Sequence, residues 1–75
     1  MDEKRTGILF YNHGIKRYDI RFGLEEYYDG LQCGECFEVY TGKAWIPVRI
    51  ETRSNGDGYL VGLPGVAVEG LTVRI

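Results

Sequence analysis

The residues most suited to metal binding or redox chemistry are two cysteines separated by two residues, Cys33 and Cys36. A C-x₂-C pair can supply two thiolates to zinc, yet a structural zinc site needs four ligands, and beyond these cysteines the chain offers only His13. A thioredoxin-like pair would lie at the start of a helix, whereas this pair precedes a predicted strand. We interpret the pair as two reduced thiols that flank a glycine turn, and we expect no cofactor. A zinc- or redox-linked C-x₂-C function is our third hypothesis.

Acidic residues are concentrated in and after the segment that follows Phe22. The carboxylates are Glu25, Glu26, Asp29, Glu35 and Glu38. Carboxylate pairs transfer protons in catalysis only where a cleft shifts their pKa values, whereas a charge run on a short turn is usually a solvated face. We therefore predict that the protein is not an enzyme. The predicted partner-binding residues of this segment are Glu25, Glu26, Tyr27 and Asp29, which would meet a basic surface.

Two aromatic residues, Tyr40 and Trp45, are predicted to pair across two strands on the outward face of the sheet. Aromatic residues dominate binding hot spots, so this pair is our second predicted partner-binding feature. The alternative is that the two rings cover the end of the core or pack on the acidic segment through Tyr27 and Tyr28.

Basic residues on the predicted strands support an alternative, nucleic-acid-binding function. Its candidate residues are Lys43, Arg49 and Arg53, next to aromatic rings on which bases could stack. The net charge of −2 gives no general attraction to nucleic acid. Acids such as Asp19, Glu38 and Glu51 alternate with the strand arginines, so cross-strand ion pairs are the simpler use of these charges.

Alternation of apolar and polar residues predicts the strands that position these side chains. The predicted strands cover residues 6–11, 15–22, 35–41, 45–51, 59–63 and 71–75. In the second strand, Tyr18, Ile20 and Phe22 should point inward, with Arg17, Asp19 and Arg21 outward. A loop over residues 41–44 would pair Tyr40 with Trp45, Val39 with Ile46 and Phe37 with Val48.

One segment follows a helical rather than an alternating spacing. Leu24, Tyr27, Tyr28 and Leu31 recur at helical intervals, and the two glutamates lie where a helix dipole favours them. Gly30 is placed as a C-terminal cap. We predict one short helical turn here, with Leu24 and Leu31 as its apolar anchors.

Seventy-five residues with 44% hydrophobic content form one domain. We expect a flexible N-terminus over residues 1–5 and a single mainly β domain over residues 6–75. Five to six short antiparallel strands favour a small barrel, and the order of the elements resembles an SH3-like barrel without the aromatic peptide groove. The longest apolar run, Ile8 to Tyr11, is far too short for a membrane span, so we expect a cytoplasmic protein with no membrane partner.

Five segments of the chain resemble a family of short Firmicutes proteins, a domain of unknown function. These segments are YDIRFGLEEYYDGL (18–31), CGECFEV (33–39), W-x-P-x-R-I-E (45–51), YLVG (59–62) and GLxVRI (70–75). The resemblance implies kinship and no particular activity. Its members occur in genomes rich in mobile elements, which implies a phage or conjugative origin.

Our first hypothesis is a non-enzymatic protein-binding module, an adaptor or inhibitor of a host or defence protein. The second is a small nucleic-acid-binding β-barrel. We expect a monomer or a weak dimer.

Overall fold

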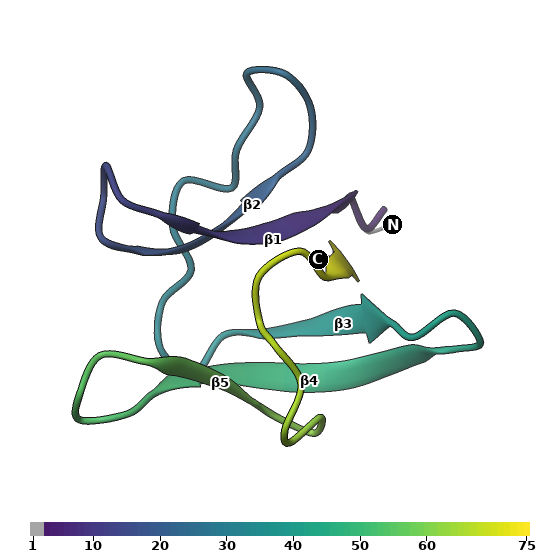
Figure 1. The fold of residues 1–75 in the computed structure, drawn as a ribbon. Helices are drawn as coiled ribbons and strands as arrows, with labels where there is room; N and C mark the ends of the chain where they lie inside the picture. Colours follow the sequence, from purple (N-terminus) through teal and green to yellow (C-terminus); the bar gives the residue numbers. More distant parts are fainter. Residues whose placement is uncertain (1–2) are drawn as a thin grey trace.

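The computed structural model describes residues 3–75 as one six-stranded antiparallel sheet with the strand order β2-β1-β6-β3-β4-β5. The strands are β1 (Thr6–Asn12), β2 (Arg17–Arg21), β3 (Cys36–Tyr40), β4 (Trp45–Thr52), β5 (Gly58–Val61) and β6 (Thr72–Arg74). Figure 1 shows β1 and β2 crossing over the layer of β3, β4 and β5, with β6 between them. The predicted mainly β antiparallel fold is confirmed. Within residues 3–75 the two outer strands, β2 and β5, do not pair, so the barrel is not closed.

The hairpin of β3 and β4 has the register that the alternation predicts. Val39 lies opposite Ile46, and Tyr40 lies opposite Trp45. Phe37 lies opposite Val48, and both side chains are buried. The inward side chains of the two strands therefore meet in the core, as the period of two requires.

The core lies between the two layers of the curved sheet. Its most completely buried side chains are Leu9, Ile20, Val39 and Val73, one each from β1, β2, β3 and β6. The loop between β2 and β3 adds Leu31, which is 4% exposed. The core is therefore assembled from strands that are far apart in the sequence.

The predicted helical turn over residues 24–31 is wrong, because this segment follows the free edge of β2. Tyr28 donates its backbone N–H to Ile20 (2.9 Å), and Leu31 donates to Tyr18 (2.8 Å). Fewer than ten residues hold no helix without tertiary support, whereas a strand edge offers unpaired backbone groups. Asp29 and Gly30 have positive φ angles (73° and 104°), which also turn the chain out of a helical path. The edge of β2 is therefore covered.

Asp19 points away from the core, as predicted, but it is fully buried rather than exposed in an ion pair. Its Oδ1 accepts hydrogen bonds from the backbone N–H groups of Ile20 (2.8 Å) and Gly30 (2.9 Å). Its Oδ2 accepts one from the side-chain amide of Asn12 (3.1 Å). The segment that covers β2 thus buries Asp19, and Asp19 in turn anchors that segment.

The predicted flexible terminus, residues 1–5, falls partly outside the described residues, which begin at Glu3. The backbone N–H of Arg5 donates to the carbonyl of Ile75 (2.9 Å), and the backbone N–H of Ile75 donates to the carbonyl of Arg5 (3.0 Å). The two ends of the described chain therefore lie side by side (Figure 1). Nowhere in residues 3–75 is there a helix with the length and apolar character needed to cross a membrane.

Candidate functional site

Large apolar side chains gather on the outer surface of β1 and on the loop after β2. We call Ile8, Phe10, Leu24 and Tyr27 the apolar patch. Ile8 is 46% exposed, Tyr27 is 39% exposed and Leu24 is 85% exposed. The rings of Phe10 and Tyr27 lie with their centroids 5.8 Å apart. A shallow hollow of about 320 Å³ opens between Ile8, Phe10, Tyr27 and Arg21.

The backbone of the loop that carries Leu24 accepts two hydrogen bonds from Arg21. The Nε of Arg21 donates to the carbonyl of Gly23 (2.8 Å), and its Nη2 donates to the carbonyl of Leu24 (3.1 Å). The backbone N–H of Phe22 donates to the carbonyl of Glu26 (2.7 Å), which closes the loop. These bonds fix the backbone while the side chain of Leu24 stays in solvent.

The predicted acidic residues border this patch. Glu26 forms an ion pair with Arg5 (2.7 Å), whose guanidinium lies 3.9 Å from the centroid of the Phe22 ring. Glu25 and Asp29 are exposed, and within the described chain neither forms an ion pair. The structure therefore brings Glu25, Glu26, Tyr27 and Asp29 together in one loop.

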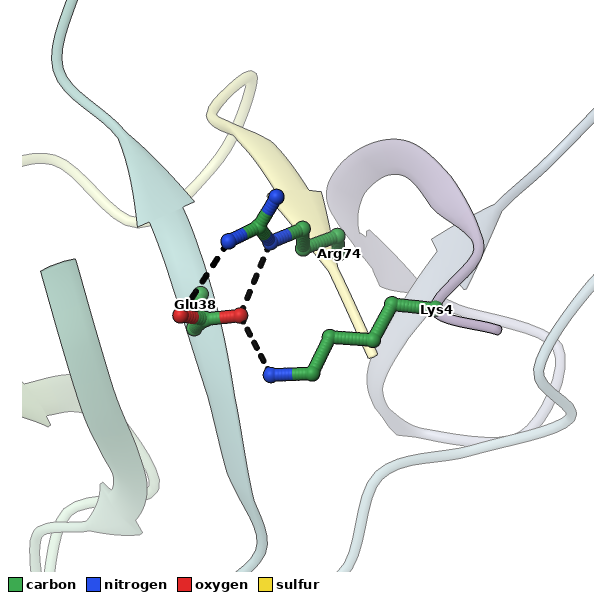
Figure 2. A network of polar contacts seen from close by, with 3 residues as sticks. All are labelled: Lys4, Glu38 and Arg74. Atoms are coloured by element: carbon green, nitrogen blue, oxygen red, sulfur yellow. Dashed lines mark hydrogen bonds and ion pairs between the residues drawn. The ribbon is translucent and has the colours of Figure 1, made fainter. Parts of the chain in front are cut away.

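The predicted aromatic pair forms a second surface feature, which includes an arginine. The centroids of Tyr40 and Trp45 are 5.1 Å apart, and the guanidinium of Arg74 lies 4.2 Å from the Trp45 ring. Arg74 is held by Glu38 through contacts of 2.8 and 3.4 Å, and Lys4 also donates to Glu38 (2.5 Å). Figure 2 shows both cations converging on this carboxylate. Their hydrogen bonds, first that of Arg74 and then that of Lys4, lower the pKa of Glu38 to about 2.

The aromatic pair does not pack on the acidic segment, which was one of the predicted alternatives. In the described part of the chain, the Tyr27 ring lies tilted against that of Phe10, and the hydroxyl of Tyr28 donates to Glu35 (2.7 Å). The two surfaces are connected instead through the N-terminal segment. Lys4 contacts Glu38 beneath the aromatic pair, and its neighbour Arg5 contacts Glu26 at the apolar patch.

The three candidate nucleic-acid residues are spread along β4 rather than gathered. Arg49 pairs with Glu51 on its own strand (2.8 Å), and the guanidinium of Arg53 lies 4.6 Å from the Tyr59 ring centroid. Lys43 and Arg53 flank opposite ends of the strand. Its 8 residues span roughly 26 Å at about 3.3 Å per residue. The structure therefore shows no single basic surface that contains all three residues.

Cys33 and Cys36 are free and exposed, on either side of a turn at Gly34 (φ 92°). The thiol of Cys33 donates to Glu51 (3.3 Å) and lies 3.4 Å from the hydroxyl of Thr52. The thiol of Cys36 instead donates to the Gly34 carbonyl (3.8 Å). Over residues 3–75, no three histidine, cysteine or acidic side chains form a cluster able to hold a metal ion.

The sequence reasoning missed Ile8 and Phe10 and misplaced Leu24. We expected Leu24 to anchor a helical turn in the core, whereas it is the most exposed large apolar side chain that the structure describes. The signal for the other two was present in the run from Ile8 to Tyr11. A run without polar residues places apolar side chains on both faces of a strand, so one face must lie outside the core.

Comparison with known proteins finds a family match and a structural match. A family model described as "Domain of unknown function (DUF5348)" matches residues 7–75. The fold is similar to the crystal structure of a protein from Ruminococcus gnavus, a structural genomics target, with a TM-score of 0.86 and 54% sequence identity. That match covers 95% of this chain and 100% of the other. No curated protein matches the chain.

Proposed function

The chain belongs to the DUF5348 family, a domain of unknown function, and we propose that it is a non-enzymatic protein-binding module. Its contact surface is the apolar patch with the acidic residues around it. The observation that supports this most strongly is Leu24, 85% exposed on a loop whose backbone is fixed. Burying a leucine side chain is favourable by about 2 kcal/mol, so this position gains free energy when a partner covers it.

The fixed loop lowers the entropic cost of association. Binding loses affinity when loops must become ordered at the interface. Here the bonds from Arg21 to the carbonyls of Gly23 and Leu24 already order the loop in the free protein. The hollow beside Tyr27 adds a place where an apolar side chain of the partner can insert.

The charges around the patch define the chemistry of the partner. Glu25 and Asp29 are exposed, two residues before and two residues after Tyr27, and Glu26 is paired with Arg5. A protein that presents one or two apolar side chains beside a lysine or arginine matches this surface. Opposite charges at the rim mainly raise the association rate and the specificity, so binding should weaken as salt is added.

The resemblance to a family found in mobile-element-rich genomes supports one extension of this proposal. The partner would then be a host or defence protein, and the module an adaptor or inhibitor acting on it.

The proposal is tested by comparing two aspartate substitutions at exposed apolar positions. Leu24→Asp alters the patch, whereas Val66→Asp alters a side chain that is 40% exposed in the loop between β5 and β6 and is not part of the patch. A partner captured from cells of the source organism should bind the purified wild-type protein and Val66→Asp with equal affinity. It should bind Leu24→Asp at least about tenfold more weakly, the loss of about 1.4 kcal/mol.

Two outcomes would contradict the proposal. One is a partner that binds Leu24→Asp as tightly as the wild-type protein. The other is a stable dimer in sedimentation velocity that Leu24→Asp dissociates, since a second copy of the chain would then be the occupant of the patch.

A further inference from the structure

A second hollow lies where the sheet stays open between β2 and the hairpin of β4 and β5. We call it the seam pocket. It has a volume of about 220 Å³. Its sides include Lys16 from the turn between β1 and β2, Arg17 from the start of β2 and Thr52 from the end of β4. It exists because within the described residues the sheet does not close.

The inner part of the seam pocket is apolar and aromatic. Leu31 and Ile50, each 4% exposed, lie at the bottom. Tyr11 and Tyr18 form one wall, with ring centroids 5.2 Å apart in an edge-to-face arrangement. Burial, and then the carboxylate of Glu69, raises the pKa of Tyr18, so this ring stays a neutral phenol. These groups suit a planar aromatic ring.

The outer part of the seam pocket is basic. Lys16 and Arg17 are exposed, and in the portion of the chain that the structure describes neither forms an ion pair. Lys16 adopts a positive φ of 56°, which is uncommon for a lysine. A wider hollow shares Lys16, Arg17 and Thr52 with the seam pocket, so the basic side is open to solvent.

Three acids, Glu51, Asp57 and Glu69, lie near the pocket, and within residues 3–75 none of them pairs with Lys16 or Arg17. Glu51 accepts a hydrogen bond from the Cys33 thiol and pairs with Arg49. Asp57, next to the pocket residue Gly56, accepts a hydrogen bond from the side-chain amide of Asn55 (3.1 Å). Glu69, whose carboxylate raises the pKa of Tyr18, does not line the pocket. Because no acid in the described residues is paired with Lys16 or Arg17, both cations remain available to an anion from solution.

We propose that the seam pocket binds a small aromatic anion. The ring lies on Leu31 and Ile50 beside the two tyrosines, and the anionic group meets Lys16 and Arg17. A cavity of about 150 Å³ is enough for benzene, whereas drug-sized ligands need about 300 Å³ or more. The volume of this pocket therefore fits one aromatic ring with one phosphate or carboxylate group.

The test is a ¹H–¹⁵N NMR titration of the full chain with phenyl phosphate, phenol and inorganic phosphate as separate probes. Phenyl phosphate should give saturable shifts at the amides of Lys16, Arg17 and Thr52. Phenol and inorganic phosphate should each bind at least about tenfold more weakly, because each lacks half of the recognised groups.

Two variants that each replace a lysine by neutral glutamine provide the matched comparison. Lys16→Gln should weaken phenyl phosphate binding about fivefold. Lys43→Gln, which removes the same charge from the loop between β3 and β4, should leave phenyl phosphate binding unchanged. The proposal is overturned if no saturable shift occurs, if inorganic phosphate binds as tightly as phenyl phosphate, or if Lys16→Gln binds like the wild-type protein.

Discussion

Replacing Asp19 by alanine should be among the most destabilising single substitutions on the outward face of the sheet. The carboxylate is 0% exposed and accepts three hydrogen bonds, from Ile20, Gly30 and Asn12. Alanine would leave three donors without a partner, two of them backbone N–H groups. A buried donor that loses its partner costs about 1–3 kcal/mol. We expect Asp19→Ala to lower the free energy of unfolding by roughly 2–5 kcal/mol, since the loop can relax toward water.

Asp19→Asn should cost less, because an amide oxygen can still accept from Ile20 and Gly30. Its NH₂ group would face the NH₂ of Asn12, and Asn12 cannot reverse its amide freely because its Oδ1 accepts from Gly14 (3.0 Å). We expect a loss of about 1–2 kcal/mol from this one broken contact. A domain of this length has a total stability of only about 4–11 kcal/mol, so both effects are measurable.

The assay is urea unfolding followed by the fluorescence of Trp45, with Asp29→Asn as the control. Asp29→Asn removes the same charge from the loop that Asp19 anchors, and asparagine tolerates the positive φ of 73° found there. The control should lie within about 0.5 kcal/mol of the wild-type protein. The reasoning fails if Asp19→Ala is as stable as the control, or if Asp19→Asn is less stable than Asp19→Ala.

Two further predictions concern the ion network and a glycine. The pKa of Glu38 falls from 4.5 to about 2 on folding, so its ionised form stabilises the folded state above about pH 4.5, and this contribution is lost as pH falls toward 2. The Tm of Glu38→Gln should therefore fall less over that range than the wild-type Tm, and parallel curves would contradict the assignment. Gly62→Ala should destabilise the fold more than Gly42→Ala. Both glycines have a positive φ, which costs a side chain about 1–3 kcal/mol, but a Cβ at Gly62 would also lie 2.7 Å from the Pro47 carbonyl oxygen, whereas Gly42 faces open space. Equal losses in urea unfolding would show that the contact with Pro47 does not matter.

The hairpin of β3 and β4 could be predicted in register because one face of each strand is buried. A slip of one residue would turn Phe37, Val39 and Val48 out of the core, so the sequence pattern allows one pairing. The turn at Gly34 could be predicted for a similar local reason, since the backbone there needs a positive φ.

The loop after β2 could not be predicted, because its conformation depends on groups far from it in the sequence. Leu24, Tyr27 and Leu31 have a helical spacing, but the free edge of β2 offered hydrogen bonds that a short isolated helix could not match. The same edge explains the burial of Asp19. The alternation of the strand predicts that this side chain is exposed, but the loop covers it. The exposure of Leu24, on which the proposed function depends, follows from that change.

The position of β6 has a consequence for how the domain is synthesised and folds. Strand pairing between the β1–β2 hairpin and the β3–β5 sheet runs through the three residues of β6, which pair with Thr6–Ile8 on one side and with β3 on the other. On the ribosome each half can form its local hairpins, but the two cannot be joined until residue 74 has emerged. Contacts of such long sequence separation slow folding, in the range of milliseconds to seconds for small β proteins. Until β6 pairs, the backbone edges of β1 and β3 that it covers stay unpaired and exposed, and the chain is most vulnerable to aggregation and proteolysis.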